Sequence, residues 1–209
     1  MTQRKVSQSG ILFMSENKRG ISIVVISGSI RPGNFTNKAL GIVIDEIKRH
    51  EDIKLEVIDP VNFKLPLPGE KENASTKRLK ELVSEATGII MATPEYHGSF
   101  SSVIKLIVEN LGYPSVLAGK TISLLGVASG EIGAIKAIEH LSSVLSHIGG
   151  IVLPGPVSIA SVHTVFDKEG RCLKESMEKR LHDLANNHIK YIRNHICPKM
   201  ALEELVRGK

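Results

Sequence analysis

Apolar residues follow two patterns in this chain, and the two patterns alternate. Runs in which most positions are apolar occupy residues 21–26, 88–93 and 121–127, a shorter run occupies 151–153, and residues 53–58 alternate between apolar and polar. Unbroken runs of this kind predict strands that are buried on both faces of a parallel sheet. We therefore expect these five segments to be strands.

Between the runs, apolar residues recur at helical spacing. A stripe at i, i+3, i+4 and i+7 predicts a helix that packs one face on a sheet, and the first such stripe consists of Leu40, Val43, Ile44 and Ile47. Further stripes predict helices around residues 79–86, from 99 or 100 to 111, around 138–148 and from about 174 to 194.

Strands that alternate with helices in this way predict an α/β fold. We expect a flavodoxin-like three-layer αβα sandwich, with a five-stranded parallel sheet in the order 2-1-3-4-5. In that order the connection reverses direction between strands 1 and 3, and ligands bind at such a switch point. The loops at residues 28–34 and 94–99 follow these two strands, so they are expected to meet there.

The pattern fits one domain. Residues 21–195 are expected to form a flavodoxin-like domain, with a mobile N-terminal extension at 1–20 and a C-terminal tail at 196–209. The apolar patch at residues 11–14 is too short for a signal peptide, and no run is long enough to span a membrane. The distant cysteines Cys172 and Cys197 argue against a disulfide framework, so we expect a soluble cytoplasmic protein.

The charge favours a small phosphorylated ligand over a nucleic acid. The formal net charge is +5, and the lysines are spread over several helices without interleaved aromatic residues. An acidic electron carrier of the flavodoxin type would carry the opposite sign. His140 and His147 share a helix but lack a third ligand nearby, so no metal site is predicted.

The first loop, residues 28–34, has the composition of a phosphate cradle. Hydroxyl, amide and guanidinium donors stand directly before a helix N-terminus, where anions bind, and they are supplied by Ser29, Arg31, Asn34 and Thr36. The loop lacks the Lys-Ser/Thr ending of a Walker A motif and the spacing of a dinucleotide fingerprint. The other interpretation is a simple turn in which Asn34 or Thr36 caps the helix.

The second loop, residues 94–99, offers different chemistry. Pro94 and Gly98 fix a backbone whose N–H groups can face the edge of a planar ring, and Tyr96 offers an aromatic wall. A flavin or another large heterocycle fits such a loop.

In combination, these loops resemble the NADPH-dependent FMN reductase family. The resemblance rests on Gly28-Ser29-Ile30-Arg31 with Asn34 and Thr36, and on Pro94-Glu95-Tyr96-His97-Gly98-Ser99. Residues 124–134 resemble the third flavin loop of that family and residues 149–154 its fifth strand, so the similarity covers roughly 21–154. The chain departs from the family at Asn34, where serine is common, at His97, where asparagine is more usual, and at Ser101-Ser102, which replace a frequent Pro-Gly.

The resemblance implies a site residue by residue. The FMN phosphate would be held by Ser29, Arg31, Asn34 and Thr36, the isoalloxazine by Pro94, Glu95, Tyr96, His97 and Gly98, and its pyrimidine end by Ser129 and Gly130. No side chain is expected to be catalytic, because the cofactor carries the chemistry.

Three roles stay open at this point. Arg31 binds either the FMN phosphate or the 2′-phosphate of NADPH. Glu95 caps the third helix, pairs with an arginine of a partner subunit or contacts the cofactor. A protonated His97 would stabilise reduced flavin, although a plain hydrogen bond within the loop is the favoured interpretation.

The implied reaction is hydride transfer from NADPH to FMN, followed by electron transfer to a flavin, quinone, azo compound or metal ion. The alternatives are a non-enzymatic FMN-binding electron carrier and a phosphate-binding regulatory module without flavin. The resemblance also implies a homodimer or homotetramer. Its expected contact surfaces are residues 99–111 and 157–166, because their apolar content exceeds what packing on the sheet needs.

Overall fold

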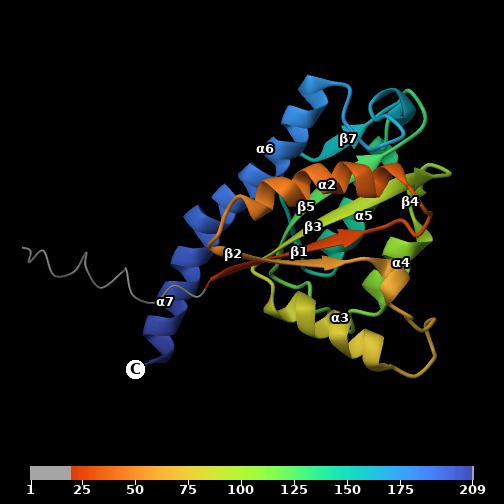
Figure 1. The fold of residues 1–209 in the computed structure, drawn as a ribbon. Coiled ribbons are helices and arrows are strands. Elements are labelled where there is room, and N and C mark those ends of the chain that lie inside the picture. The colour runs from red at the N-terminus through yellow and green to blue at the C-terminus, as the bar shows by residue number, and fades with distance from the viewer. Residues whose placement is uncertain (1–19, 209) are drawn as a thin grey trace, which may run out of the picture.

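The structure is a computed structural model that describes residues 20–208. A parallel sheet lies between two layers of helices (Figure 1). Its path runs β2-β1-β3-β5-β6, through β2 (Ile53–Ile58), β1 (Ile21–Ser27), β3 (Gly88–Tyr96), β5 (Thr121–Val127) and β6 (Ile151–Val152). This confirms the predicted order, since β5 is the fourth of the five predicted strands. The expectation for residues 1–19 lies outside the described residues.

The fifth strand is interrupted. β6 pairs with the start of β5, and β7 (Val157–Ile159) pairs with its end, both in parallel. The interruption contains Pro154 and Pro156, which have no N–H group to donate to a sheet. β7 was not predicted as a strand, and it continues the sheet toward the edge where the loops lie.

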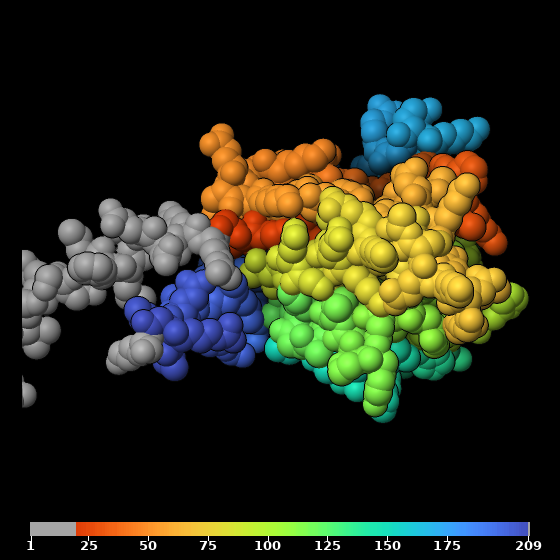
Figure 2. Space-filling model, turned by 90° about the horizontal axis from the view of Figure 1, so that it is seen from below, coloured from red at the N-terminus to blue at the C-terminus, as the bar shows by residue number. Residues whose placement is uncertain are grey.

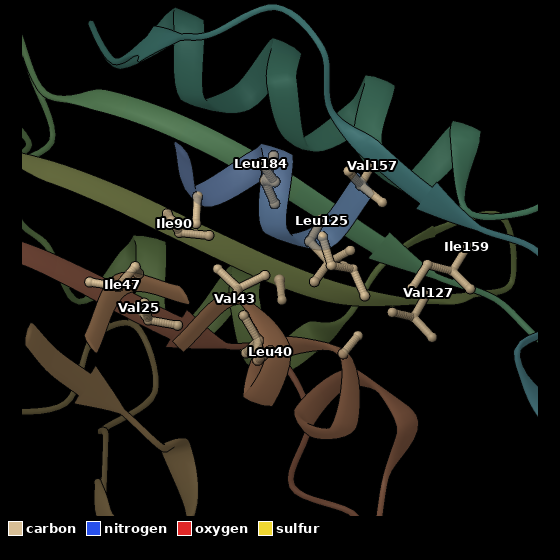
Figure 3. Close-up of a cluster of buried hydrophobic side chains, with 14 of the residues drawn as sticks. Val25, Leu40, Val43, Ile47, Ile90, Leu125, Val127, Val157, Ile159 and Leu184 are labelled. Carbon is tan, nitrogen blue, oxygen red and sulfur yellow. The ribbon is translucent and has the colours of Figure 1, made fainter. Parts of the chain in front are cut away.

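Successive residues of the central strands point into two different cores, as a doubly covered sheet requires. On one face the sheet packs against α2 (Phe35–Lys48) and α6 (Glu175–Tyr191). Figure 3 shows this core, with Leu40, Val43 and Ile47 of α2 directed toward the sheet. The opposite face is covered by α3 (Ala74–Glu85), α4 (Ser102–Glu109) and α5 (Ile135–His147).

The second loop is a β-hairpin, which corrects the expectation that the third strand ends before Pro94. β3 continues through Pro94 to Tyr96, and it pairs with β4 (Ser99–Phe100) in antiparallel fashion. The two turn residues, His97 and Gly98, have φ angles of 50° and 74°. Positive φ at both positions is typical of the tight hairpin turn whose twist matches the strands. The third helix therefore begins only at Ser102, not at residue 99 or 100.

The C-terminal region is helical beyond the predicted end at residue 194. α6 passes through the π-helical turn η4 (Ile192–Ile196) into α7 (Cys197–Arg207). The apolar stripe that predicts this helix consists of Leu181, Leu184, Ala185 and His188 in α6 and Ile192 in η4, and all five residues are buried, which confirms the predicted inner face. α7 stands at one end of the molecule (Figures 1 and 2) and buries none of its residues.

The apolar residues behind the expected contact surfaces are largely buried within the chain itself. The side chains that pack into its own cores include Ile104, Ile107, Val157, Ile159 and Phe166. That argument for a contact surface is therefore wrong, since β7 belongs to the sheet and the Phe166 ring lies 6.4 Å from that of Phe35, centroid to centroid. Within residues 20–208, no helix combines the length and apolar character that crossing a membrane requires.

Candidate flavin site

The carboxyl ends of β1, β3 and β5 lie side by side, so the loops that follow them share one edge of the sheet. The register pairs Ser27 with Ala92, and Thr93 with Gly126. The first loop (residues 28–34), the second loop (94–99) and the third loop (126–133) therefore start at neighbouring positions. The predicted meeting of the first and second loops at the switch point is confirmed.

The first loop folds back on the N-terminus of α2. The Asn34 side chain caps this helix, because its Oδ1 accepts a hydrogen bond of 2.7 Å from the backbone N–H of Asn37. Asn34 Nδ2 donates to the Arg31 carbonyl at 2.7 Å, and Ser27 Oγ donates to Asn37 Oδ1 at 2.5 Å. Asn34, and not Thr36, is therefore the cap, while Thr36 is buried in the first turn of α2.

Ser29 carries an unpaired hydroxyl beside this helix N-terminus. Its side chain is 2% exposed, and its Oγ finds no hydrogen-bond partner among residues 20–208. A buried hydroxyl without a partner is costly, and most such groups in proteins are paired. Together with the partial positive charge of a helix N-terminus, this donor fits a phosphate group.

A cleft of about 540 Å³ runs along the first loop. Its lining includes three predicted residues, Ser29, Arg31 and Asn34, and two that the sequence analysis missed, Asp59 and Val61. The remaining lining residues are Ile30, Pro32, Gly33, Asn37 and Lys38. Asp59 follows β2, whose carboxyl end lies beside that of β1, and this adjacency was the available signal. Residues of the second and third loops are not part of this lining.

Arg31 and Tyr96 bring the first two loops into contact. The guanidinium carbon of Arg31 lies 4.6 Å from the centroid of the Tyr96 ring, which is a cation–π arrangement. Arg31 is exposed and Tyr96 half-buried, so both border the surface of the site. His97 is exposed at the tip of the hairpin turn.

Ser101 links the first two loops through buried hydrogen bonds. Its Oγ donates to the Gly28 carbonyl at 2.7 Å and accepts from the Ile104 N–H at 3.2 Å, so it also caps α4. Its own N–H donates to Thr93 Oγ1 at 3.0 Å. A Cβ at residue 28 would lie 2.5 Å from Ile104 Cγ1, so the close packing of the first loop on α4 requires glycine at this position.

Glu95 caps α5, the fourth predicted helix. Its Oε2 accepts a hydrogen bond of 3.1 Å from the Ala137 N–H in the first turn of α5. The expectation that Glu95 caps the third helix is therefore wrong, because Ser101 already fills that role. No sequence pattern reveals the Glu95 contact, since its partner is 42 residues away.

The third loop is held by β7 and by the segment that follows it. The Gly130 carbonyl accepts from the Ser161 N–H at 2.9 Å, and Ser158 Oγ accepts from the Ala134 N–H at 2.9 Å. Ser129 and Gly130 are exposed, and the space beside Gly130 where a Cβ would stand is open within 4 Å. The backbone of this loop is thus accessible to a ligand.

Within residues 20–208, no group of three or more His, Cys, Asp or Glu side chains is placed to hold a metal ion. His140 lies on the surface of α5, where its Nδ1 is 3.1 Å from Ser99 Oγ of the hairpin.

The model of the NADPH-dependent FMN reductase family matches residues 21–164, a range that contains all three loops. The chain belongs to this family. It is 30% identical over 163 residues to an NAD(P)H-dependent FMN reductase of Pseudomonas aeruginosa, covering 74% of this chain and 86% of the relative. It is 29% identical over 168 residues to an NADPH azoreductase of a Bacillus strain, covering 78% of this chain and 88% of the relative.

The fold is also that of a solved flavoenzyme. The NAD(P)H:(acceptor) oxidoreductase of Paracoccus denitrificans superimposes with a TM-score of 0.72 at 20% identity, over 84% of this chain and 98% of the other. As a member of the FMN reductase family, the protein is an FMN-dependent NAD(P)H oxidoreductase, with FMN and NADPH as its cofactors. Family membership decides against the alternatives of a non-enzymatic carrier and of a regulatory module without flavin.

Proposed function

We propose that FMN binds across the three loops, with its phosphate at the N-terminus of α2 and its isoalloxazine against the hairpin and the third loop. The observation that carries this proposal is the buried, unpaired hydroxyl of Ser29 in the first turn after β1. Asn34 and Thr36 belong to the same helix N-terminus and complete the proposed phosphate site. Phosphate needs several converging donors, and a helix N-terminus supplies backbone N–H groups in addition.

We assign Arg31 to the flavin side of the site. Its guanidinium lies over Tyr96, between the proposed positions of the phosphate and the ring. In this position the positive charge of Arg31 is close to both the phosphate and the ring of the proposed FMN. This favours a role in flavin binding over recognition of the NADPH 2′-phosphate.

Bound FMN supplies the redox chemistry, because it accepts a hydride from NADPH and releases electrons to an acceptor. The chain supplies position and hydrogen bonds. Tyr96 would pack against the ring, the backbone of residues 94–98 would lie along it, and the backbone at Ser129 and Gly130 would face its pyrimidine end. N–H donors at that end stabilise the negative charge that grows there on reduction, so the proposal includes no catalytic side chain. The proposed acceptors are small molecules such as quinones, azo compounds, free flavins or metal ions.

We also propose that the enzyme works in the cytoplasm as a homodimer or homotetramer. Apolar side chains are exposed on the loops of the site, with Ile30 55% and Ile132 78% exposed, and a second subunit would cover them. Cys172 and Cys197 are free thiols, which suits a reducing compartment. Light scattering after size-exclusion chromatography tests the assembly, and a monomer at micromolar concentration would contradict it.

The function is tested by the visible spectrum of the purified protein with added FMN under anaerobic conditions. We expect FMN to bind and its absorbance to bleach with NADPH, then to return when a quinone or azo dye is added. Flavin that binds but is bleached by neither NADPH nor NADH would contradict the proposed reaction. Protein that binds no FMN would contradict the proposed site.

A further inference from the structure

Helix α5 begins directly after the third loop without a side-chain cap of its own. Its N-cap residue is Ala134, which makes no side-chain hydrogen bond to the helix. The first N–H groups of a helix have no partner within it, so they need acceptors from elsewhere. One of these acceptors is the carboxylate of Glu95, which reaches the Ala137 N–H from the hairpin of the second loop.

The hairpin rests on α5 through two more contacts. Ser99 Oγ lies 3.1 Å from Nδ1 of His140, one turn further along the helix than Ala137. Phe100, which faces Glu95 across the hairpin, packs against the small buried side chains of Ala134 and Ala137. Both strands of the hairpin are therefore tied to the first two turns of α5.

The carboxylate of Glu95 is well suited to hold the hairpin against the N-terminus of α5. A negative charge at a helix N-terminus is stabilised by the helix dipole, and a hydrogen bond to a charged acceptor is stronger than one between neutral groups. The contact between Ser99 and His140 is exposed, whereas the hydrogen bond of Glu95 is partly buried, so the Ser99 contact is expected to be weaker. Glu95 is thus the main polar link between the hairpin and the helix.

We infer that Glu95 is a positioning residue whose side chain fixes the second flavin loop relative to the third, and that this side chain does so without touching the flavin. This inference rests on the proposed flavin site, because it assigns the two loops to one cofactor. The hairpin carries Tyr96 and the third loop carries Gly130, so Glu95 sets the distance between the wall of the ring and the backbone at its pyrimidine end. The resemblance to the family had placed Glu95 among the cofactor contacts.

The test compares Glu95→Ala, Glu95→Gln and the control Glu139→Ala, which removes an exposed carboxylate on the same helix. Amide hydrogen exchange of residues 95–100 and 135–138 is measured in the FMN-free protein, and FMN affinity is measured by quenching of flavin fluorescence. For Glu95→Ala we expect faster exchange in both segments and about tenfold weaker FMN binding. Glu95→Gln keeps an acceptor oxygen and is expected to restore both to within about threefold, while the control leaves both unchanged.

Two results would overturn the inference. Weaker FMN binding with unchanged exchange in the hairpin would mean that Glu95 contacts the cofactor directly. Faster exchange with unchanged FMN affinity would mean that the link does not shape the site. If Glu95→Ala fails to fold, Ser99→Ala removes the second tie and is expected to shift both readouts in the same direction, by about threefold.

The same experiment separates this inference from the proposed function. Unmutated protein that binds no FMN contradicts the flavin site, whereas the exchange data on the FMN-free protein still report whether Glu95 holds the hairpin. FMN binding that is equal in all variants, with unchanged exchange, contradicts the positioning role and leaves the flavin site intact.

Discussion

Two buried polar side chains at opposite ends of the sheet differ in one respect, which is whether they have partners. His188 of α6 is fully buried near the amino ends of the strands, with its Nδ1 2.7 Å from Ser123 Oγ and its Nε2 3.4 Å from Thr121 Oγ1. Ser29 is buried at the carboxyl ends, and its Oγ has no partner within residues 20–208. His188 is paired and therefore serves the fold, whereas the unpaired hydroxyl of Ser29 beside a helix N-terminus fits the proposed phosphate site.

The largest effect is expected on stability, when the paired residue His188 is replaced. His188→Ala leaves a cavity and removes the hydrogen-bond partner of Ser123 and one of the two partners of Thr121, so we expect the free energy of unfolding to fall by about 3 kcal/mol. Urea denaturation measures this loss. FMN affinity of the folded protein should stay within about twofold, and a tenfold loss of affinity with unchanged stability would contradict the structural assignment.

The stability of the unmutated protein is expected to depend on pH through His188. Burial lowers the pKa of His188 to about 4, from an ordinary value of 6.5. Between these values the unfolded chain binds the proton that the folded chain excludes, so stability falls as the pH falls through this window. We expect about 2 kcal/mol of this loss between pH 7 and pH 5. Subtracting the free energy of unfolding of His188→Ala from that of the unmutated protein at each pH isolates this loss. Parallel pH profiles of stability for the two proteins would contradict the prediction.

Ser29→Ala tests the proposed role of the unpaired hydroxyl in FMN binding. The hydroxyl lacks a protein partner, so its removal is expected to leave the free energy of unfolding unchanged or raise it by about 0.5 kcal/mol. FMN binding should weaken about tenfold, because one phosphate donor is lost. Fluorescence titration and urea denaturation on the same preparation check both halves, and a loss of stability without a change in affinity would reverse the assignment.

Arg31→Ala is expected to have the smallest effect, about fivefold on FMN affinity, because the guanidinium is exposed and solvent screens its charge. The fold should be unaffected. The ratio of KM values for NADPH and NADH decides the alternative role. An unchanged ratio agrees with the flavin side, whereas a selective rise of the KM for NADPH would assign Arg31 to the 2′-phosphate.

Much of the fold was predictable because the central strands are buried on both faces. Val24 and Val25 both have no exposed surface, although they point into different cores, and only an unbroken apolar run meets that demand. β7 was missed because two prolines separate it from β6. The hairpin was missed because Pro94 was interpreted as the end of a strand, whereas the positive φ angles at His97 and Gly98 permit a tight turn just beyond it.

The site was predictable where its residues are consecutive and less so where they come from distant elements. Ser29, Arg31 and Asn34 line one cleft because they share one loop, and their role in holding a phosphate stays a prediction. Asp59 joins them only through the pairing of β1 with β2. The contact of Glu95 with α5 depends on how a hairpin packs on a helix, which no local pattern encodes.

The central claim is that the N-terminus of α2 and Ser29 hold the phosphate of FMN. The most direct measurement compares the dissociation constants of FMN and riboflavin, which lacks the phosphate, for the unmutated protein and for Ser29→Ala. We expect FMN to bind about a hundredfold more tightly than riboflavin, and Ser29→Ala to reduce this ratio about tenfold while riboflavin binding stays the same. Equal affinity for FMN and riboflavin in the unmutated protein would contradict the claim.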